Sequence, residues 1–194
     1  MLPNFSNLEI ILGSTSPRRS QILSDAGFKF QIKSKNIEEE YPNSLFKEEI
    51  PLFLANLKAQ PLIEYLQDEL LITADTIVWL NNEVIGKPKD KIDAYHILTK
   101  LSGKTHEVIT GVFLYKNGKS SNFFDVTEVT FRNLEEEEIK RYIDQFQPMD
   151  KAGAYGIQDW IGLTTVTKIN GCYYNVMGLP MPKLYQQLSN ISLT

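Results

Sequence analysis

The chain of 194 residues is long enough for one domain with a substantial core, and its 42% hydrophobic and 23% charged residues are ordinary for a globular protein. Its net charge of −4 provides no global basic field for nucleic acid or an anionic membrane, so any anion site must be local. The single cysteine excludes an internal disulfide and a cysteine metal cluster. We find neither a signal-peptide pattern nor an apolar run of membrane-spanning length, so we expect a cytoplasmic protein.

A short strand, a small-residue turn and a helix open the chain. Ile10–Leu12 predict a buried strand, Gly13-Ser14-Thr15-Ser16 a turn, and Pro17 suits the first position of the following helix. The positive end of a helix dipole and its unpaired N–H groups bind anions. Arg18 and Arg19 oppose that dipole, which is reasonable if a polyanion binds between them. The alternative is that both arginines are solvated surface residues.

The remaining elements alternate between strands and helices. We predict strands over 28–33, 70–80, 83–85, 106–115, 123–131 and 161–169, and helices over 47–67, 90–101, 133–146 and 179–188. Pro61 should kink or split its helix, and Asn133 can cap the helix after it. Tight turns are expected at Asn81-Asn82 and Asn117-Gly118. This order predicts an α/β fold in which helices flank a mixed sheet, with no composition break inside residues 1–194.

Two acidic residues are candidates for chemistry. Asp75 interrupts an apolar strand, so it must be ion-paired, bound to a metal or placed at the exposed end of the strand. Carboxylates at strand ends in α/β folds often face a ligand crevice, although a structural salt bridge is equally reasonable here. Glu38 lies in an acidic loop that could simply be solvated.

Two lysines complete a basic set with Arg18 and Arg19. Lys58 lies on an amphipathic helix and Lys87 in a constrained Gly-Lys-Pro loop, and each could equally be a surface residue. The glycine-rich nucleotide motifs are missing, and neither histidine accompanies a serine nucleophile elbow. A polyphosphate requires a basic clamp of this kind, and Mg²⁺ with its bound water requires carboxylates.

Short motifs along nearly the whole chain resemble, in order, those of the Maf family of nucleoside triphosphate pyrophosphatases. They are SxSPRR at Ser14–Arg19, Ile37-Glu38-Glu39, Leu57-Lys58-Ala59, Ala74-Asp75-Thr76, Gly86-Lys87-Pro88, Leu101-Ser102-Gly103 before His106, the stretch 148–158 that ends in GAYGIQ, and 174–180. Any one of these motifs alone would be a weak match, and together they are a strong one.

The resemblance implies a Maf/ITPase-like fold with two lobes around a cleft, and hydrolysis of a nucleoside triphosphate to the monophosphate and pyrophosphate. It implies that Asp75 and Glu38 are catalytic, with Asp75 as acid/base, and that both hold a divalent metal, Mg²⁺ or Mn²⁺. The implied phosphate ligands are Ser14, Arg18, Arg19, Lys58 and Lys87, and the residues linked to base choice are Arg18, Thr76 and Gln158. The GAYGIQ form resembles the branch that acts on dTTP and UTP, and a homodimer is the family's expected assembly.

Two positions depart from the family pattern. Gly13 stands where the family often has alanine, which we expect to be harmless. Asp159-Trp160 follows Gln158 where a glycine-containing pair is common, and this bears on the shape of the base-side loop. A different class of function is a nucleotide-sensing, septum-related interaction protein with little turnover. The paired acidic residues favour the enzyme, because a pure binding protein would not need both.

Overall fold

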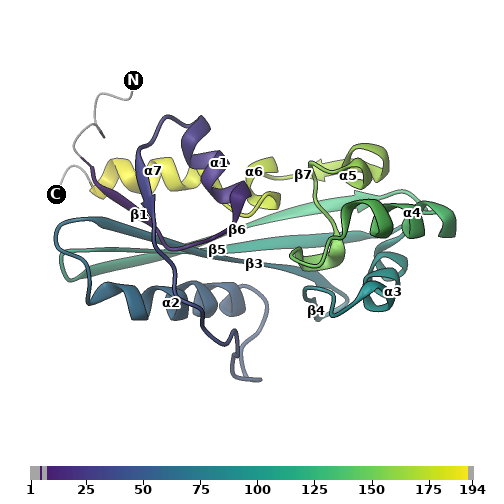
Figure 1. The fold of residues 1–194 in the computed structure, drawn as a ribbon, viewed down its shortest axis with the longest axis horizontal. Helices are drawn as coiled ribbons and strands as arrows, with labels where there is room; N and C mark the ends of the chain where they lie inside the picture. The colour runs from purple at the N-terminus through teal and green to yellow at the C-terminus, as the bar shows by residue number, and fades with distance from the viewer. Residues whose placement is uncertain (1–4, 6–7, 192–194) are drawn as a thin grey trace. The chain divides into compact units, whose positions relative to one another are not determined.

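The computed structural model describes Phe5 and residues 8–191, and its elements alternate as the sequence predicts (Figure 1). The strands are β1 (Ile10–Leu12), β2 (Phe30–Ile32), β3 (Leu70–Leu80), β4 (Glu83–Ile85), β5 (Thr105–Lys116), β6 (Lys119–Phe131) and β7 (Val166–Asn170). The helices are α1 (Pro17–Asp25), α2 (Glu49–Ile63), α3 (Lys91–Leu101), α4 (Glu136–Phe146), α5 (Trp160–Thr165), α6 (Tyr173–Val176) and α7 (Met181–Ile191), with a 3₁₀ turn at Ala152–Ala154. The predicted α/β class is confirmed.

Within the described residues, seven strands form one mixed sheet in the order β2-β1-β3-β5-β6-β7, and β4 pairs with β3. β1 runs parallel to both β2 and β3, whereas β3–β4 and β6–β7 are antiparallel. The parallel pairs require the crossover helices α1 and α2, while the tight turn at Asn117-Gly118 joins β5 to β6. Both turn residues have positive φ, 49° and 77°, as a two-residue hairpin requires.

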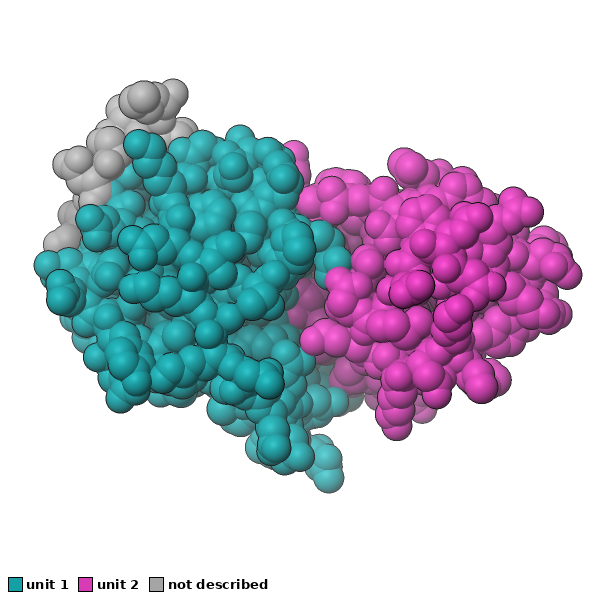
Figure 2. Space-filling model, in the orientation of Figure 1, with its two compact units in different colours: residues 1–75, 110–125, 178–194 teal, residues 76–109, 126–177 magenta. Residues whose placement is uncertain are grey.

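The chain divides into two compact units, coloured separately in Figure 2. The first contains residues 1–75, 110–125 and 178–194, and the second contains residues 76–109 and 126–177. The divisions fall inside β3, β5 and β6, so each of these three strands supplies residues to both units. The single domain over 1–194 and the cleft between two lobes stay predictions.

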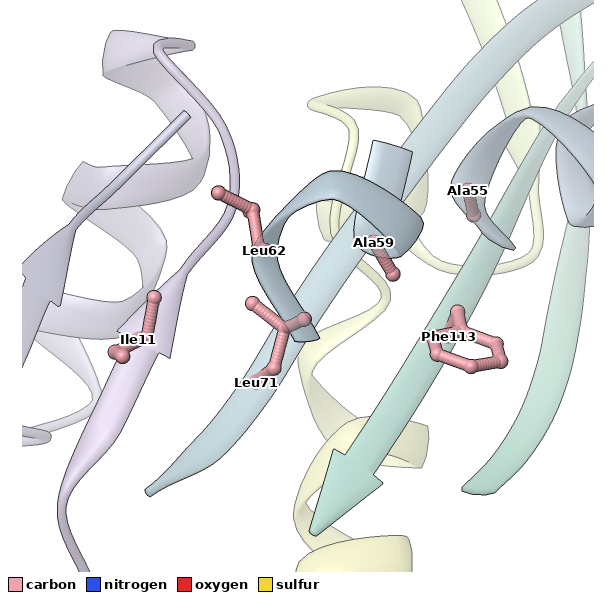
Figure 3. Close-up of a cluster of buried hydrophobic side chains, with 6 residues drawn as sticks. All are labelled: Ile11, Ala55, Ala59, Leu62, Leu71 and Phe113. Atoms are coloured by element: carbon pink, nitrogen blue, oxygen red, sulfur yellow. The ribbon is translucent and has the colours of Figure 1, made fainter. Parts of the chain in front are cut away.

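The core of the first unit forms where α2 packs on the sheet. Ala55, Ala59 and Leu62 of α2 contact Ile11 of β1, Leu71 of β3 and Phe113 of β5 (Figure 3). The three helix residues are spaced four and three apart and so share one face of α2. Figure 1 shows α1 and α7 on the opposite side of these strands from α2. Both faces of β3 are therefore covered, which explains its nearly continuous apolar sequence.

Some predicted element boundaries are wrong. α2 remains one helix through Pro61 and ends two residues later, at Ile63. The cap of α4 is Glu135, not Asn133, because Glu135 and Glu138 form a reciprocal capping box.

The predicted strand over 161–169 is a strand only in its second half. Trp160–Thr165 form α5, in which the hydroxyls of Thr164 and Thr165 donate to the carbonyls of Trp160 and Ile161, four residues back. Threonine hydroxyls reach the carbonyls four residues back in a helical turn, so the strand preference of threonine does not hold over this segment.

His106 of β5 is enclosed in the core of the second unit, where its side chain is 2% exposed. Its Nε2 lies 2.8 Å from the Tyr155 hydroxyl. Its ring meets Phe131 and Tyr155 edge to face, at centroid distances of 5.0 and 5.4 Å. Burial lowers the pKa of His106 from 6.5 to about 4, so the ring is neutral at pH 7.

We expect His106 to make stability fall in weak acid. Between pH 6.5 and 4, His106 is protonated in the unfolded chain but stays neutral in the folded protein. The free energy of unfolding therefore falls as the pH falls. At pH 5 the loss relative to pH 7.5 should be about 2 kcal/mol, measurable by urea unfolding. His106→Gln should reduce this pH dependence by that amount, and His96→Gln, at an exposed position, should leave it unchanged. If stability depended on pH equally in the native protein and in both variants, His106 would not be the source of the pH dependence.

Candidate active site

Alternate side chains of β3 point toward α2. Leu71, Thr73 and Asp75 lie on one face of the strand, because side chains two apart point the same way. Leu71 joins the apolar cluster with α2, and the Thr73 hydroxyl donates to the Ala55 carbonyl at 2.7 Å. The next position, Asp75, meets Lys58, which lies one turn beyond Ala55 on the helix.

Lys58 joins two carboxylates from different parts of the first unit. Its Nζ lies 2.5 Å from Asp75 Oδ1 and 2.9 Å from Glu39 Oε1. The Asp75 side chain is 8% exposed and the Lys58 side chain 15%, so this pair is shielded from solvent, whereas the Glu39 side chain is 39% exposed. Of the three alternatives for Asp75, an ion pair, a metal or an exposed strand end, the structure shows the ion pair.

Arg19 connects the turn after β1 to the start of the C-terminal segment. Its guanidinium donates from Nε to the Gly178 carbonyl at 2.7 Å and from Nη1 to Ser14 Oγ at 3.1 Å. Burial lowers the pKa of Arg19 and nearby Arg18 lowers it further, whereas Asp75 and Glu39 act in the opposite direction. Arg18, Arg19 and Lys58 are therefore the cations of one group of charged side chains, and Asp75 and Glu39 are its carboxylates.

This cluster lies at the carboxyl end of β1. Leu12 is the last paired residue of that strand, opposite Ile72, and the Gly13 amide donates to the Ile72 carbonyl at 2.8 Å. Asp75 follows Ile72 by three residues, so it lies just past the point where β1 ends. Parallel α/β sheets bind ligands at such carboxyl ends.

Gly13 is required by its close approach to Thr73. A Cβ at Gly13 would lie 2.5 Å from the Thr73 methyl carbon, and the bond from Thr73 to the Ala55 carbonyl holds that methyl in place. Glycine is harmless here, as expected, because it leaves room for threonine in the neighbouring strand.

Three other predicted residues belong to the second unit. Thr76 follows Asp75 on β3 and is half-buried, while Lys87 and Gln158 are exposed on loops. The Gly153 amide donates to the Gly86 carbonyl at 3.0 Å, so the loop that carries Lys87 contacts the segment that leads to Gln158.

Glu39 is the residue that sequence reasoning missed. The motif Ile37-Glu38-Glu39 contains two adjacent glutamates. It lies in a loop, where no strand or helix periodicity indicates which side chain points toward the sheet. Both glutamates lie at exposed positions, and the structure pairs Glu39 with Lys58. A catalytic or metal-binding role of Glu38 stays a prediction.

In α/β proteins, ligands bind outside the carboxyl ends of parallel strands, and charged side chains gather at this one. The model of the Maf-like protein family matches residues 9–191. The chain belongs to this family.

Curated relatives match over almost their whole length. A protein of Phocaeicola vulgatus named dTTP/UTP pyrophosphatase is 53% identical over 98% of this chain and 100% of its own. A protein of Flavobacterium psychrophilum with the same name is 50% identical over 96% of each chain. A solved HAM1 protein from Coxiella burnetii is 17% identical, with a TM-score of 0.44 over 64% of this chain and 73% of its own. Among the described helices, none has the length and apolar character needed to cross a membrane.

Proposed function

We propose that this chain hydrolyses dTTP and UTP to the nucleoside monophosphate and pyrophosphate. The observation that carries the proposal is the cluster in which Lys58 contacts both Asp75 and Glu39, beside Arg19 and the turn after β1. The names of the full-length relatives support the same reaction.

In the proposed reaction, the oxygen of a water molecule bonds to the α-phosphorus and the bond from that phosphorus to the bridging oxygen breaks. Pyrophosphate leaves, and Asp75 accepts the proton of the water. Ser14, Arg18, Arg19, Lys58 and Lys87 bind the phosphate oxygens, for which charged donors form strong hydrogen bonds. Because cations exceed carboxylates in the cluster of the first unit, a polyanion is attracted there.

The acidic residues fit a divalent cation. Carboxylates from two segments, Asp75 and Glu39, already converge on one cation, the Lys58 ammonium. Within the described residues no group of three or more His, Cys, Asp or Glu side chains gathers. Mg²⁺ is commonly held by one or two carboxylates together with water and substrate phosphates, which suits Asp75 and Glu39. Glu38 stays a predicted ligand. When bound, Mg²⁺ or Mn²⁺ would neutralise phosphate charge and polarise water.

Base selection is assigned to Arg18, Thr76 and Gln158. The amide of Gln158 offers both a donor and an acceptor, and Thr76 adds a hydroxyl, which together suit the O2, N3–H and O4 edge of uracil or thymine. Cytosine carries an acceptor at N3 and an amino donor in place of O4, so an amide held in one orientation should discriminate between UTP and CTP.

The test is a panel of UTP, dTTP, CTP, ATP and GTP with Mg²⁺ in which pyrophosphate release is measured. UTP and dTTP should have the highest kcat/KM, and Gln158→Ala should lose the discrimination between UTP and CTP. Equal efficiency on all five nucleotides would overturn the base assignment. Nucleotide binding without pyrophosphate release would indicate the sensing function instead.

The two adjacent glutamates should differ in effect. Glu39→Gln removes a charge that contacts Lys58, so we expect kcat to fall about 10-fold or more. Glu38→Gln is the matched control at the neighbouring exposed position. The pyrophosphate assay should show which change is greater, and a larger loss in Glu38→Gln would restore Glu38 as the acidic partner of Asp75.

A further inference from the structure

Tyr142 of α4 is a buried side chain whose hydroxyl makes two hydrogen bonds. It donates to Asp159 Oδ2 at 2.8 Å and accepts from the Gly156 amide at 3.3 Å. The side chain is 0% exposed and stacks on Phe146 of the same helix. Burial and the Asp159 carboxylate raise the pKa of Tyr142, so its hydroxyl remains a donor at neutral pH.

The two residues that bond to the Tyr142 hydroxyl, Gly156 and Asp159, lie before and after Gln158 in the chain. The Asp159 amide donates to the Gly156 carbonyl at 3.0 Å, which closes a four-residue turn, here named the 156–159 turn. Gln158 is the exposed residue of this turn, and Ile157 before it is buried. Tyr142 therefore contacts the first and the last residue of the turn that presents Gln158.

The Asp159 carboxylate lies close to both Gly156 and Lys151. A Cβ at Gly156 would lie 2.5 Å from Asp159 Oδ2, so the carboxylate is packed directly against the turn. Lys151 lies 3.7 Å from the same oxygen.

We propose that Tyr142 is a positioning residue for base selection, because its hydroxyl binds Asp159 and the Gly156 amide together and fixes the backbone on both sides of Gln158. The proposal rests on the proposed function in one respect, the assignment of Gln158 to the base edge. Tyr142 itself does not contact substrate in this account.

Tyr142→Phe removes the hydroxyl and keeps the ring, and Tyr155→Phe is the matched control. Tyr155 is also buried, and its hydroxyl bonds to His106 of β5 rather than to the 156–159 turn. The first readout is hydrogen exchange of the Asp159 amide, which closes the turn. We expect it to be about tenfold faster in Tyr142→Phe and close to native in Tyr155→Phe. Equal exchange in native protein and Tyr142→Phe, or equal acceleration in both variants, would overturn the proposal.

The second readout is the selectivity of the full-length enzyme. In Tyr142→Phe, the ratio of kcat/KM for UTP to that for CTP should fall about fivefold or more, through a higher KM for UTP and with kcat close to native. Asp159→Asn keeps an acceptor for the hydroxyl and should retain most of the selectivity. Faster exchange with unchanged selectivity would overturn the positioning role. A native protein that releases no pyrophosphate from any nucleotide would refute the proposed function, and exchange would still decide whether Tyr142 fixes the turn.

Discussion

Asp75→Asn should lower kcat for pyrophosphate release from UTP about 10²–10⁴-fold, the usual contribution of general acid–base catalysis. The amide matches the carboxylate in size and can still accept a hydrogen bond from Lys58, but it cannot accept a proton from water. Because Lys58 keeps its ion pair with Glu39 and the amide oxygen still accepts its hydrogen bond, the isosteric change should leave the fold intact. Single-turnover pyrophosphate release and circular dichroism check the two statements.

The matched control for this prediction is a surface ion pair. Asp144 bonds to Lys91 at 2.7 Å, with both side chains largely exposed, so Asp144→Asn removes a comparable carboxylate away from the cluster. Exposed pairs contribute little stability, and this variant should retain native activity. Near-native turnover in Asp75→Asn would show that Asp75 is structural.

Arg18→Ala and Lys87→Ala should each weaken triphosphate binding more than they lower stability. Loss of a charge-assisted hydrogen bond to phosphate costs roughly 1.5–3 kcal/mol, which is about 10- to 150-fold in Kd. Removal of Arg18 also relieves the repulsion between a cation and the positive end of α1, so its effect on stability should be small. Calorimetry with UTP in the inactive Asp75→Asn background measures Kd, and thermal unfolding measures Tm.

Arg19→Ala provides a contrast, because it removes hydrogen bonds to the Gly178 carbonyl and to Ser14 Oγ. We expect it to lower both affinity and Tm. Lys29→Ala, at an exposed site in the same unit, should change neither. An unchanged Kd with a lowered Tm in Arg18→Ala or Lys87→Ala would assign structural roles to those cations.

Local pattern accounts for much of the fold. The apolar run of β3, the paired asparagines before β4 and the Asn-Gly turn before β6 each act within a few residues, so composition alone predicts them. Two exceptions are α5 and the end of α2. α5 is helical although its sequence is β-branched, because the hydroxyls of Thr164 and Thr165 bond to the preceding turn. Pro61 ends α2 late rather than splitting it.

The same division holds for the site. The sequence by itself determined the membership of the family and singled out Asp75, because a charge inside an apolar strand must have a partner. Only the tertiary structure decided that this partner is Lys58 and that Glu39 joins it, and it alone revealed Tyr142 beneath the 156–159 turn. Backbone geometry fixes which residues of a strand or helix share a face, so that pattern can be predicted from the sequence. Contacts among residues 39, 58 and 75, or between 142 and 159, depend on how loops and helices pack on the sheet, which no local period encodes.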